Sequence, residues 1–561
     1  MTITEHATDF PVVWDDPADA ERHWARDRMH VPDQITPLTN SVISACFPDG
    51  VLAAMEAFSA PIARWEFRRI NTYAFANLQP RHGSPEEMAA EGAKAEAALG
   101  AAMGRLWEWW EGELLPEIHR HLGCWEAFDL PGASNDALLA HLDDTLARFR
   151  RLFEVHFLAL LPSYVALSEL EECYRATLGG SGAFDAYKLV GGHPNKTVEV
   201  GHQLWRLSRE ALAAPEVATV LRDGGGPEVV LAELRRTAAG VAFAARLEAY
   251  LDEFGQRGDL FFDLDRPAWV EDPTPALESL RHYMSQPDSA DPALVAAGLA
   301  TEREAALAAA RERFATCPEA TGNQFEFLLR AATAGVMISE DHGFWIDFRS
   351  SYKVRRVLCE FGRRLAAGDV IDRPEDVFML TVDELRAATA GTAHEWRGLV
   401  AERRAEMERF ASIRPPDTIG APPPPPPPTE NPFTRSLGKF FGAPPAEDSA
   451  GDDPGVVRGN PGAPGRVKGV ARVIRSITEA DRVQPGDILV AETTTPPWTA
   501  LFAVAAGVVT DTGGVLSHCA VVAREYGVPA VVGTVTGTDR IDDGMLIEVD
   551  GDAGVVHLPS G

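Results

Sequence analysis

The chain has 561 residues, which is too many for one hydrophobic core, so we expect two or three domains. Its 83 acidic residues outnumber its 52 basic residues and give a net charge of −31, which argues against nucleic-acid binding because that function needs basic stripes. No run of about 18 apolar residues occurs, so no membrane span is expected.

The N-terminus and the cysteines indicate the compartment. The first residues include acidic side chains and lack the apolar segment of a signal peptide. The six cysteines are scattered and form no C-x-x-C pair. We therefore expect a cytoplasmic protein with reduced thiols and no cysteine-bound zinc.

Residues 1–411 are predicted to form a large, mainly α-helical domain with minor strand content. Alanine, leucine, glutamate and arginine dominate this part, and few alternating runs occur. Helices are expected at 84–123, 136–177, 196–213, 228–255, 301–315, 323–337 and 351–367. No repeat of 34 or 40 residues is visible, so a solenoid is not expected.

The string GGHPNKT at 191–197 predicts a turn and then a helix that Asn195 or Thr197 caps. Lys196 at a helix start is unfavourable for the helix dipole, but it becomes reasonable if an anion binds there. In that case Lys196 is a candidate catalytic residue and His193 a candidate substrate contact. The alternative is a solvated lysine beside a cap.

A second unusual stretch is FGQRG at 254–258, which precedes DLDRPAW at 263–269. Arg257 could grip a phosphoryl group through its fork of donors, which makes it a candidate catalytic residue. It could equally join two helices through a carboxylate.

A third stretch, SEDHGFWIDFR at 339–349, brings acids, an imidazole, aromatic rings and a base together. His342 is a candidate general base that takes the proton of an attacking hydroxyl, oriented by Glu340 or Asp341. The candidate substrate contacts are the acids, the aromatics and the arginine of this stretch and one earlier tyrosine: Glu340, Asp341, Phe344, Trp345, Arg349 and Tyr73. The alternative is a structural turn with ordinary core aromatics.

Residues 412–454 are predicted to be a Pro-rich linker. Seven consecutive prolines at 422–428 form a stiff polyproline II rod. Four apolar residues interrupt the linker (Phe433, Leu437, Phe440 and Phe441), and we expect them to pack on one of the two domains. A spacer is favoured over a binding tract for an SH3-like partner, because it suits a small domain that travels between two sites.

Residues 455–561 are predicted to form a small α/β domain around a compact unit at 506–534. A strand at 507–510, a glycine turn, a helix at 519–526 with Ser517 as N-cap, and a return strand at 530–532 follow one another. His518 lies in the first turn of this helix, where the helix field keeps the ring neutral and favours an anion beside it. A histidine that accepts a phosphoryl group needs both properties. The alternative is a capping or packing histidine.

The residues around His518 resemble the phosphohistidine motif of phosphoenolpyruvate-utilising enzymes, which include phosphoenolpyruvate synthase, pyruvate phosphate dikinase and rifampicin phosphotransferase. The resemblance lies in GGVLSHCA at 513–520, ARE at 523–525 and GVPA at 527–530, and it extends over 462–558. It implies a swivelling domain in which His518 is the phosphoryl acceptor. Cys519 stands where the family usually has alanine, and we expect a buried structural thiol there.

Parts of residues 1–411 also resemble this family. The Gly-X-Arg element with Arg257, the following RPAW at 266–269 and PEDVFMLT at 374–381 are similar to the substrate domain of rifampicin phosphotransferase. The rifampicin enzymes carry bases near the start of the stretch 339–349, where this chain has acids and His342.

The phosphoryl donor is the part of such an enzyme that we do not find. No P-loop pattern occurs, and no segment resembles an ATP-grasp domain or a phosphoenolpyruvate-binding barrel. The domain order resembles the later two-thirds of rifampicin phosphotransferase and the non-ATP subunit of phenylphosphate synthase and alkylphenol (4-cresol) phosphate synthase.

The resemblance implies a subunit of a two-component, ATP-dependent phosphotransferase. A separate ATP-grasp subunit would supply ATP and Mg²⁺ and phosphorylate His518, while this chain binds no cofactor or metal of its own. The phosphoryl group would pass to the hydroxyl of a small molecule, a phenol or alkylphenol. The alternatives are an antibiotic phosphotransferase that needs a partner, a phosphocarrier or regulatory protein, and an inactive homologue.

Overall fold

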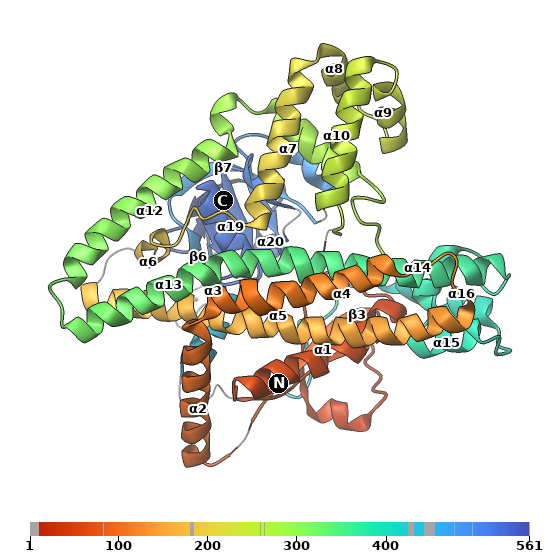
Figure 1. The fold of residues 1–561 in the computed structure, drawn as a ribbon, viewed down its shortest axis with the longest axis horizontal. Coiled ribbons are helices and arrows are strands. Elements are labelled where there is room, and N and C mark those ends of the chain that lie inside the picture. Colours follow the sequence, from red (N-terminus) through yellow and green to blue (C-terminus); the bar gives the residue numbers. More distant parts are fainter. Residues whose placement is uncertain are drawn as a thin grey trace.

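The computed structural model describes residues 10–81, 83–179, 184–258, 260–262, 264–423, 431–442, 455–475, 477–495 and 498–559. They form a large helical domain that contains one small sheet, and a C-terminal α/β domain that lies against it (Figure 1).

Helices around the long helix α5 make the body of the helical domain. They are α1 (Pro37–Ala57), α2 (Pro85–Met103), α3 (Leu106–Trp109), α4 (Leu115–Ala127), α5 (Asn135–Leu178), α13 (Glu319–His342), α14 (Ser351–Ala367), α15 (Val382–Thr389) and α16 (Trp396–Phe410), with the π-helices η3 (Trp110–Leu114) and η5 (Gly343–Ser350) and the 3-10 helices η2 (Pro17–Glu21) and η6 (Pro374–Met379). Helix α13 runs alongside α5 (Figure 1). Gly335 allows this, because a Cβ there would lie 2.9 Å from the Ser163 carbonyl oxygen of α5.

A second group of helices projects from this body. It comprises α6 (Asp185–Lys188), α7 (Lys196–Ala213), α8 (Pro215–Asp223), α9 (Pro227–Leu234), α10 (Ala238–Phe254), α11 (Thr274–Ser285), the 3-10 helix η4 (Asp288–Ala290) and α12 (Pro292–Phe314). Helices α7 and α12 lie on either side of the C-terminal domain (Figure 1).

A four-stranded antiparallel sheet lies near the N-terminus of the helical domain, in the order β2–β3–β1–β4. Its strands are β1 (His23–Arg26), β2 (Ile62–Ile70), β3 (Tyr73–Pro80) and β4 (Thr418–Gly420). The β2–β3 hairpin turns at Asn71 and Thr72, whose φ angles of 47° and 81° fit a two-residue hairpin loop. The predicted minor strand content is this sheet.

The C-terminal domain is built on one mixed sheet of eight strands in the order β5–β12–β11–β7–β8–β9–β10–β6, in which β7, β8, β9 and β10 run parallel. The strands are β5 (Val456–Arg458), β6 (Asn460–Ala463), β7 (Arg466–Val473), β8 (Ile488–Ala491), β9 (Gly507–Thr510), β10 (Ala530–Val532), β11 (Leu546–Asp550) and β12 (Val555–His557). The helices are η8 (Ile477–Arg482), α18 (Thr499–Phe502), α19 (His518–Tyr526) and α20 (Gly537–Arg540). The predicted strand–turn–helix–strand unit is β9–α19–β10, with Gly527 in the left-handed conformation at the end of the helix.

Part of the predicted linker is built into the fold. Strand β4 pairs with β1, and α17 (Pro432–Phe441) packs on α5. Phe433 is buried and Phe440 stacks on Tyr164 at 4.7 Å, so the apolar patch packs on the helical domain. Residues 424–430 and 443–454, which hold most of the proline run, lie outside the described residues.

The predicted helices are confirmed with shifted boundaries. Those at 136–177, 196–213 and 351–367 are α5, α7 and α14. The helix expected at 84–123 is interrupted near Gly104, and the one at 228–255 is interrupted before Thr237, which caps α10. The segments at 301–315 and 323–337 are parts of the longer helices α12 and α13.

Among the described residues, two helices are long and apolar enough to cross a membrane by length and composition alone, α1 and α5. In their most apolar windows, 56% of α1 and 83% of α5 is buried inside the protein. Core helices pass the same test, and α5 lies between α1 and α13 in the main hydrophobic core.

Candidate active site between the two domains

His518 is presented by a tight loop after strand β9. Gly513 has φ +95°, and a Cβ on Gly514 would lie 2.2 Å from the Lys439 carbonyl oxygen of α17. The two glycines are therefore needed for the turn and for the close approach of α17. Ser517 occupies the N-cap position of α19, which makes His518 the first residue of the helix, as the sequence predicts.

The ring of His518 faces the helical domain. Its Nδ1 lies 3.3 Å from Glu340 Oε2 on α13, and both side chains are nearly buried. Burial alone would raise the pKa of Glu340, but the imidazole of His518 and the hydroxyl of Thr197 outweigh it and lower that pKa. Glu340 is thus held as a carboxylate that can accept a hydrogen bond from Nδ1–H.

The opposite ring nitrogen, His518 Nε2, is buried and has no hydrogen-bond partner among the residues that the structure describes. Ser517 Oγ beside it also lacks a partner there, and it makes no hydrogen bond to the first turn of α19. Buried polar atoms are normally satisfied, and exceptions often mark a ligand position. The first turn of α19 therefore offers a nucleophilic nitrogen and a free hydroxyl to the same space.

That space is a cavity of about 110 Å³ between the two domains. Its wall is mostly apolar, and its aromatic side chains come from segments far apart in the chain: Phe47, Trp65, Phe153, Phe157, Tyr164, Phe261, Phe262, Phe440 and Phe441. The loops at 493–494 and 512–519 of the C-terminal domain close it on the other side. The arrangement suits a small apolar molecule whose polar group points at His518.

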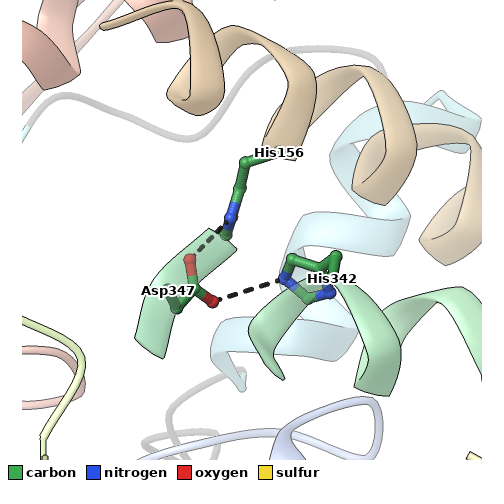
Figure 2. Close-up of side chains that lie close together, drawn as sticks. All are labelled: His156, His342 and Asp347. Carbon is green, nitrogen blue, oxygen red and sulfur yellow. Dashed lines mark hydrogen bonds and ion pairs between the residues drawn. The ribbon is translucent and has the colours of Figure 1, made fainter. Parts of the chain in front are cut away.

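One end of the cavity is polar. His156 of α5, His342 at the end of α13 and Asp347 of η5 lie together there (Figure 2). Asp347 Oδ1 is 3.0 Å from His156 Nδ1, and Asp347 Oδ2 is 3.5 Å from His342 Nε2. Burial lowers the pKa of His342 to about 4. These three groups could hold a metal ion, although we expected no metal-ligating cluster from the sequence.

The π-helix η5 brings His342 and Asp347 to the same end. In an α-helix, residues five apart lie about 140° apart around the axis at 3.6 residues per turn. A π-helix closes i→i+5 hydrogen bonds, so residues five apart come close to each other, and such segments occur often at functional sites. Asp347 itself is buried, and the neighbouring imidazoles keep its pKa low against the effect of burial.

Of the predicted site residues, the structure brings His518, Glu340 and His342 together in this cavity. Three others line a second, more open cleft beside α7: His193, Lys196 and Asp341. Asp341 Oδ1 accepts a hydrogen bond from the Lys196 backbone N–H, and Lys196 Nζ pairs with Glu199 at 2.7 Å. Lys196 is thus balanced by carboxylates at the helix start, and the expected anion is not needed to explain it.

The predicted aromatic contacts point away from the cavity. Phe344 and Trp345 pack in the core of the projecting helices, and the Arg349 guanidinium lies 4.9 Å and 4.8 Å from their ring centroids. Arg257 is buried with its guanidinium 5.0 Å from the rings of Trp269 and Phe348. None of these four predicted residues lines the cavity.

Tyr73 is also remote from the cavity. Its hydroxyl donates to the backbone carbonyls of Phe410 and Ile413, and its ring packs against Phe10. Tyr73 therefore ties the start of β3 to the segment that follows α16.

Sequence reasoning missed His156 and the aromatic wall. His156 lies in the middle of an ordinary helical run, and the wall residues are scattered from Phe47 to Phe441. Nothing local distinguishes them from core residues, since aromatic side chains are mostly buried in any protein. Cys519 is a buried thiol, as expected, and burial raises its pKa to about 11.

Contacts of opposite charge hold the C-terminal domain in this position. Arg28 of the helical domain reaches Glu492 at 2.5 Å and Asp511 at 3.0 Å. The Gly192 backbone N–H donates to Glu525 of α19, and burial raises the pKa of Glu525 to about 7. His518 therefore faces the cavity in a specific docked position.

Two family models match the chain. Residues 156–340 match the fourth domain of rifampicin phosphotransferase, and residues 483–554 match the mobile domain of PEP-utilising enzymes. The first match begins at His156 and ends at Glu340, and the second contains His518.

Curated relatives agree with these matches. The chain is 39% identical to chondramide synthase cmdD of Chondromyces crocatus over 98% of its own length but 14% of that protein. It is 30% identical to the rifampicin phosphotransferase of Streptomyces sviceus over 72% of the chain and 44% of the relative. It is 26% identical to the uncharacterised phosphotransferase YvkC of Bacillus subtilis over 97% of the chain and 62% of the relative. The chain thus spans less than two thirds of each relative, and it belongs to the PEP-utilising phosphotransferase family, with a mobile domain beside a domain of the rifampicin phosphotransferase type.

Proposed function

We propose that this chain transfers a phosphoryl group from His518 Nε2 to the hydroxyl of a small apolar molecule, a phenol or alkylphenol. The observation that carries the proposal is the position of Nε2. It is buried without a described partner and faces a cavity between the two domains that is lined by aromatic side chains.

The ring environment suits phosphoryl transfer. In phosphorylated His518 the Nδ1–H donates to the Glu340 carboxylate, which stabilises the positive charge of the ring. The substrate oxygen attacks phosphorus, an O–P bond forms and the P–Nε2 bond breaks, with the electron pair left on Nε2. Nδ1 keeps its proton, so the leaving group is neutral imidazole, and the hydroxyl proton passes to solvent.

His342 was predicted from the sequence to take that proton. It does line the polar end, but a pKa near 4 makes a neutral imidazole a weak base toward a phenol, whose pKa is about 10. Activation of the hydroxyl therefore needs more than His342 alone.

The size and lining of the cavity support a phenol. An apolar cavity of about 150 Å³ is known to bind benzene. The cavity here, about 110 Å³ with a wall of aromatic side chains, is of the size of a single ring. A phenol bound with its ring against this wall would point its hydroxyl to the polar end of the cavity and to Nε2.

We further propose that a separate ATP-grasp subunit carries Mg-ATP and phosphorylates His518 in the cytoplasm, with release of AMP and phosphate. The mobile domain would leave the docked position to meet this donor and then return. The ion pairs of Arg28 with Glu492 and Asp511 are of the kind that can break and re-form in such a movement.

A second candidate is phosphorylation of a larger antibiotic. The match of residues 156–340 to the fourth domain of rifampicin phosphotransferase favours it. A molecule of several rings would need the cavity to widen beyond its volume in the docked position.

The proposal is tested by intact-mass analysis of the full chain mixed with Mg-ATP, with and without candidate ATP-grasp subunits. We expect one phosphoryl group on the chain only when the partner is present, and none on His518→Ala. Phenol, 4-cresol and rifampicin are then added to the phosphorylated chain, and loss of the protein-bound phosphoryl group is followed together with the product.

Phosphorylation with ATP alone would contradict the separate subunit, because it requires a nucleotide site in this chain. A phosphoryl group that passes to another protein and to none of the three hydroxyl compounds would favour a phosphocarrier. Absence of phosphorylation with every donor, phosphoenolpyruvate included, would indicate an inactive homologue.

A further inference from the structure

We propose that His156, His342 and Asp347 bind a divalent transition-metal ion at the polar end of the cavity.

The spacing of the three groups fits one ion. A ligand atom from each residue lies within 4.8 Å of the other two. The Asp347 carboxylate lies 3.0 Å from His156 Nδ1 through Oδ1 and 3.5 Å from His342 Nε2 through Oδ2. Donor atoms that bind one ion at about 2.0–2.2 Å lie roughly 3.0–3.5 Å from each other. The side chains converge from two elements, α5 and the α13–η5 junction, onto the same point (Figure 2).

The hydrogen bonding of His342 argues for a cation. Its Nδ1 lies 3.1 Å from the Ile338 carbonyl oxygen, which can only accept, so the proton of the neutral ring is on Nδ1. Nε2 then presents a lone pair, and it faces Asp347 Oδ2 at 3.5 Å. Two acceptors that face each other in a buried site repel unless a cation lies between them.

The same pattern is typical of metal-binding histidines. Such a residue usually donates its second ring N–H to a backbone carbonyl or a carboxylate, which fixes the tautomer and the ring orientation. Ile338 supplies that carbonyl for His342. Two imidazole nitrogens and one carboxylate are a ligand set for ions such as Zn²⁺ or Fe²⁺, whereas Mg²⁺ and Ca²⁺ prefer oxygen ligands only.

Three protein ligands leave coordination positions open to the cavity. If the proposed function holds, on which this step rests, the substrate hydroxyl binds there and loses its proton to solvent, because a bound cation lowers the pKa of a coordinated hydroxyl. The resulting oxyanion faces His518 Nε2 and attacks phosphorus.

The test is direct binding of Co²⁺ or Zn²⁺ by the full, tag-free chain after removal of metals with a chelator. Bound ion is measured by elemental analysis after dialysis, and Co²⁺ coordination by its visible absorption bands. The variants are Asp347→Asn, which keeps the shape of the side chain, and His342→Gln. The matched control is His121→Gln, because His121 Nε2 faces Glu117 at 3.6 Å and the described residues place no third metal-ligating group beside them.

We expect one ion per chain in the wild type and in the control, and a loss of affinity of more than ~100-fold in both variants, since even second-shell changes cost about 10–100-fold. Zn²⁺ should raise the thermal unfolding midpoint of the wild type and not that of Asp347→Asn. Metal-free unfolding curves of the variants show whether they fold.

Absence of a bound ion in the wild type, or equal binding by wild type and Asp347→Asn, would overturn the proposal and favour a hydrogen-bonded cluster. Binding is measured without phosphoryl donor or substrate. A negative result for metal binding therefore does not contradict the proposed phosphoryl transfer, and a negative result for phosphoryl transfer does not contradict metal binding.

Discussion

The two sides of the contact between His518 and Glu340 are built in different ways. On the mobile side, one continuous segment from β9 through α19 to β10 makes the turn, caps the helix and places His518. On the helical side, the cavity needs α5, α13, η5, the N-terminal sheet and α17 to pack together. A domain that leaves and returns must carry its reactive residue on a unit that stays folded alone, whereas the acceptor cavity can depend on the packing of a larger body.

Loss of the Glu340 charge should have the largest effect, because it should slow phosphoryl transfer without preventing phosphorylation of the mobile domain. In Glu340→Gln we expect transfer from phosphorylated His518 to fall roughly 10- to 100-fold, because the carboxylate keeps the proton on Nδ1 that lets the ring leave as neutral imidazole, and a charge-assisted hydrogen bond contributes about 1.5–3 kcal/mol. Phosphorylation of His518 by its donor should persist. Single-turnover decay of the phosphorylated chain with substrate measures the effect. The neighbour Asp341→Asn, which faces the other cleft, is the control, and an equal loss there would refute the direct role.

The aromatic wall should determine affinity for the substrate. Phe262 packs near Phe47 and Phe153, and Phe262→Leu should raise the KM of a phenol by up to ~10-fold, since an aromatic pair is worth about 0.5–1.5 kcal/mol. The effect on kcat should be smaller. Steady-state kinetics measure both.

The control for this variant is Phe314→Leu. Phe314 stacks on Phe325 at 4.0 Å in a different cluster and does not line the cavity. It should lower the unfolding midpoint and leave KM unchanged. An unchanged KM in Phe262→Leu would show that the aromatic wall does not contribute to substrate binding.

Docking itself should be sensitive to Arg28. Arg28→Gln removes the contacts to Glu492 and Asp511 and should shift the equilibrium toward the undocked form by a few-fold, as expected for about 1 kcal/mol. The wild type should respond to salt more than the variant does. Energy transfer between dyes on the two domains measures docking. Arg64→Gln, whose partner Glu66 lies in the same small sheet, is the control and should have no effect.

The smallest expected effect is on the pH dependence of docking. Burial in the docked form raises the pKa of Glu525 from 4.5 to about 7. The docked form therefore holds this proton more tightly, so the contribution to docking is present below about pH 4.5 and is lost as the pH rises to about 7. The same dye signal across this range should show the change, and Glu525→Gln should flatten it. An identical profile in the variant would assign the pH dependence to another group.

The sequence by itself determined the mobile side. The glycines at 513 and 514, the N-cap at Ser517 and Gly527 at the helix end are local signals, and the structure confirms the unit they predict. The helical character of residues 1–411 followed from composition and periodicity, because helix formation depends on residues within a few turns. Boundaries shifted where Gly104 or a cap interrupted a continuous pattern.

Only the tertiary structure decided the cavity. Glu340 and Asp341 are adjacent in sequence, yet one faces His518 and the other faces the second cleft. Phe344 and Trp345 are packed away from the site, while His156 and Phe441 are part of it. Which face of a helix meets which neighbour depends on long-range packing, such as the close approach of α13 to α5 at Gly335, and no local pattern encodes that.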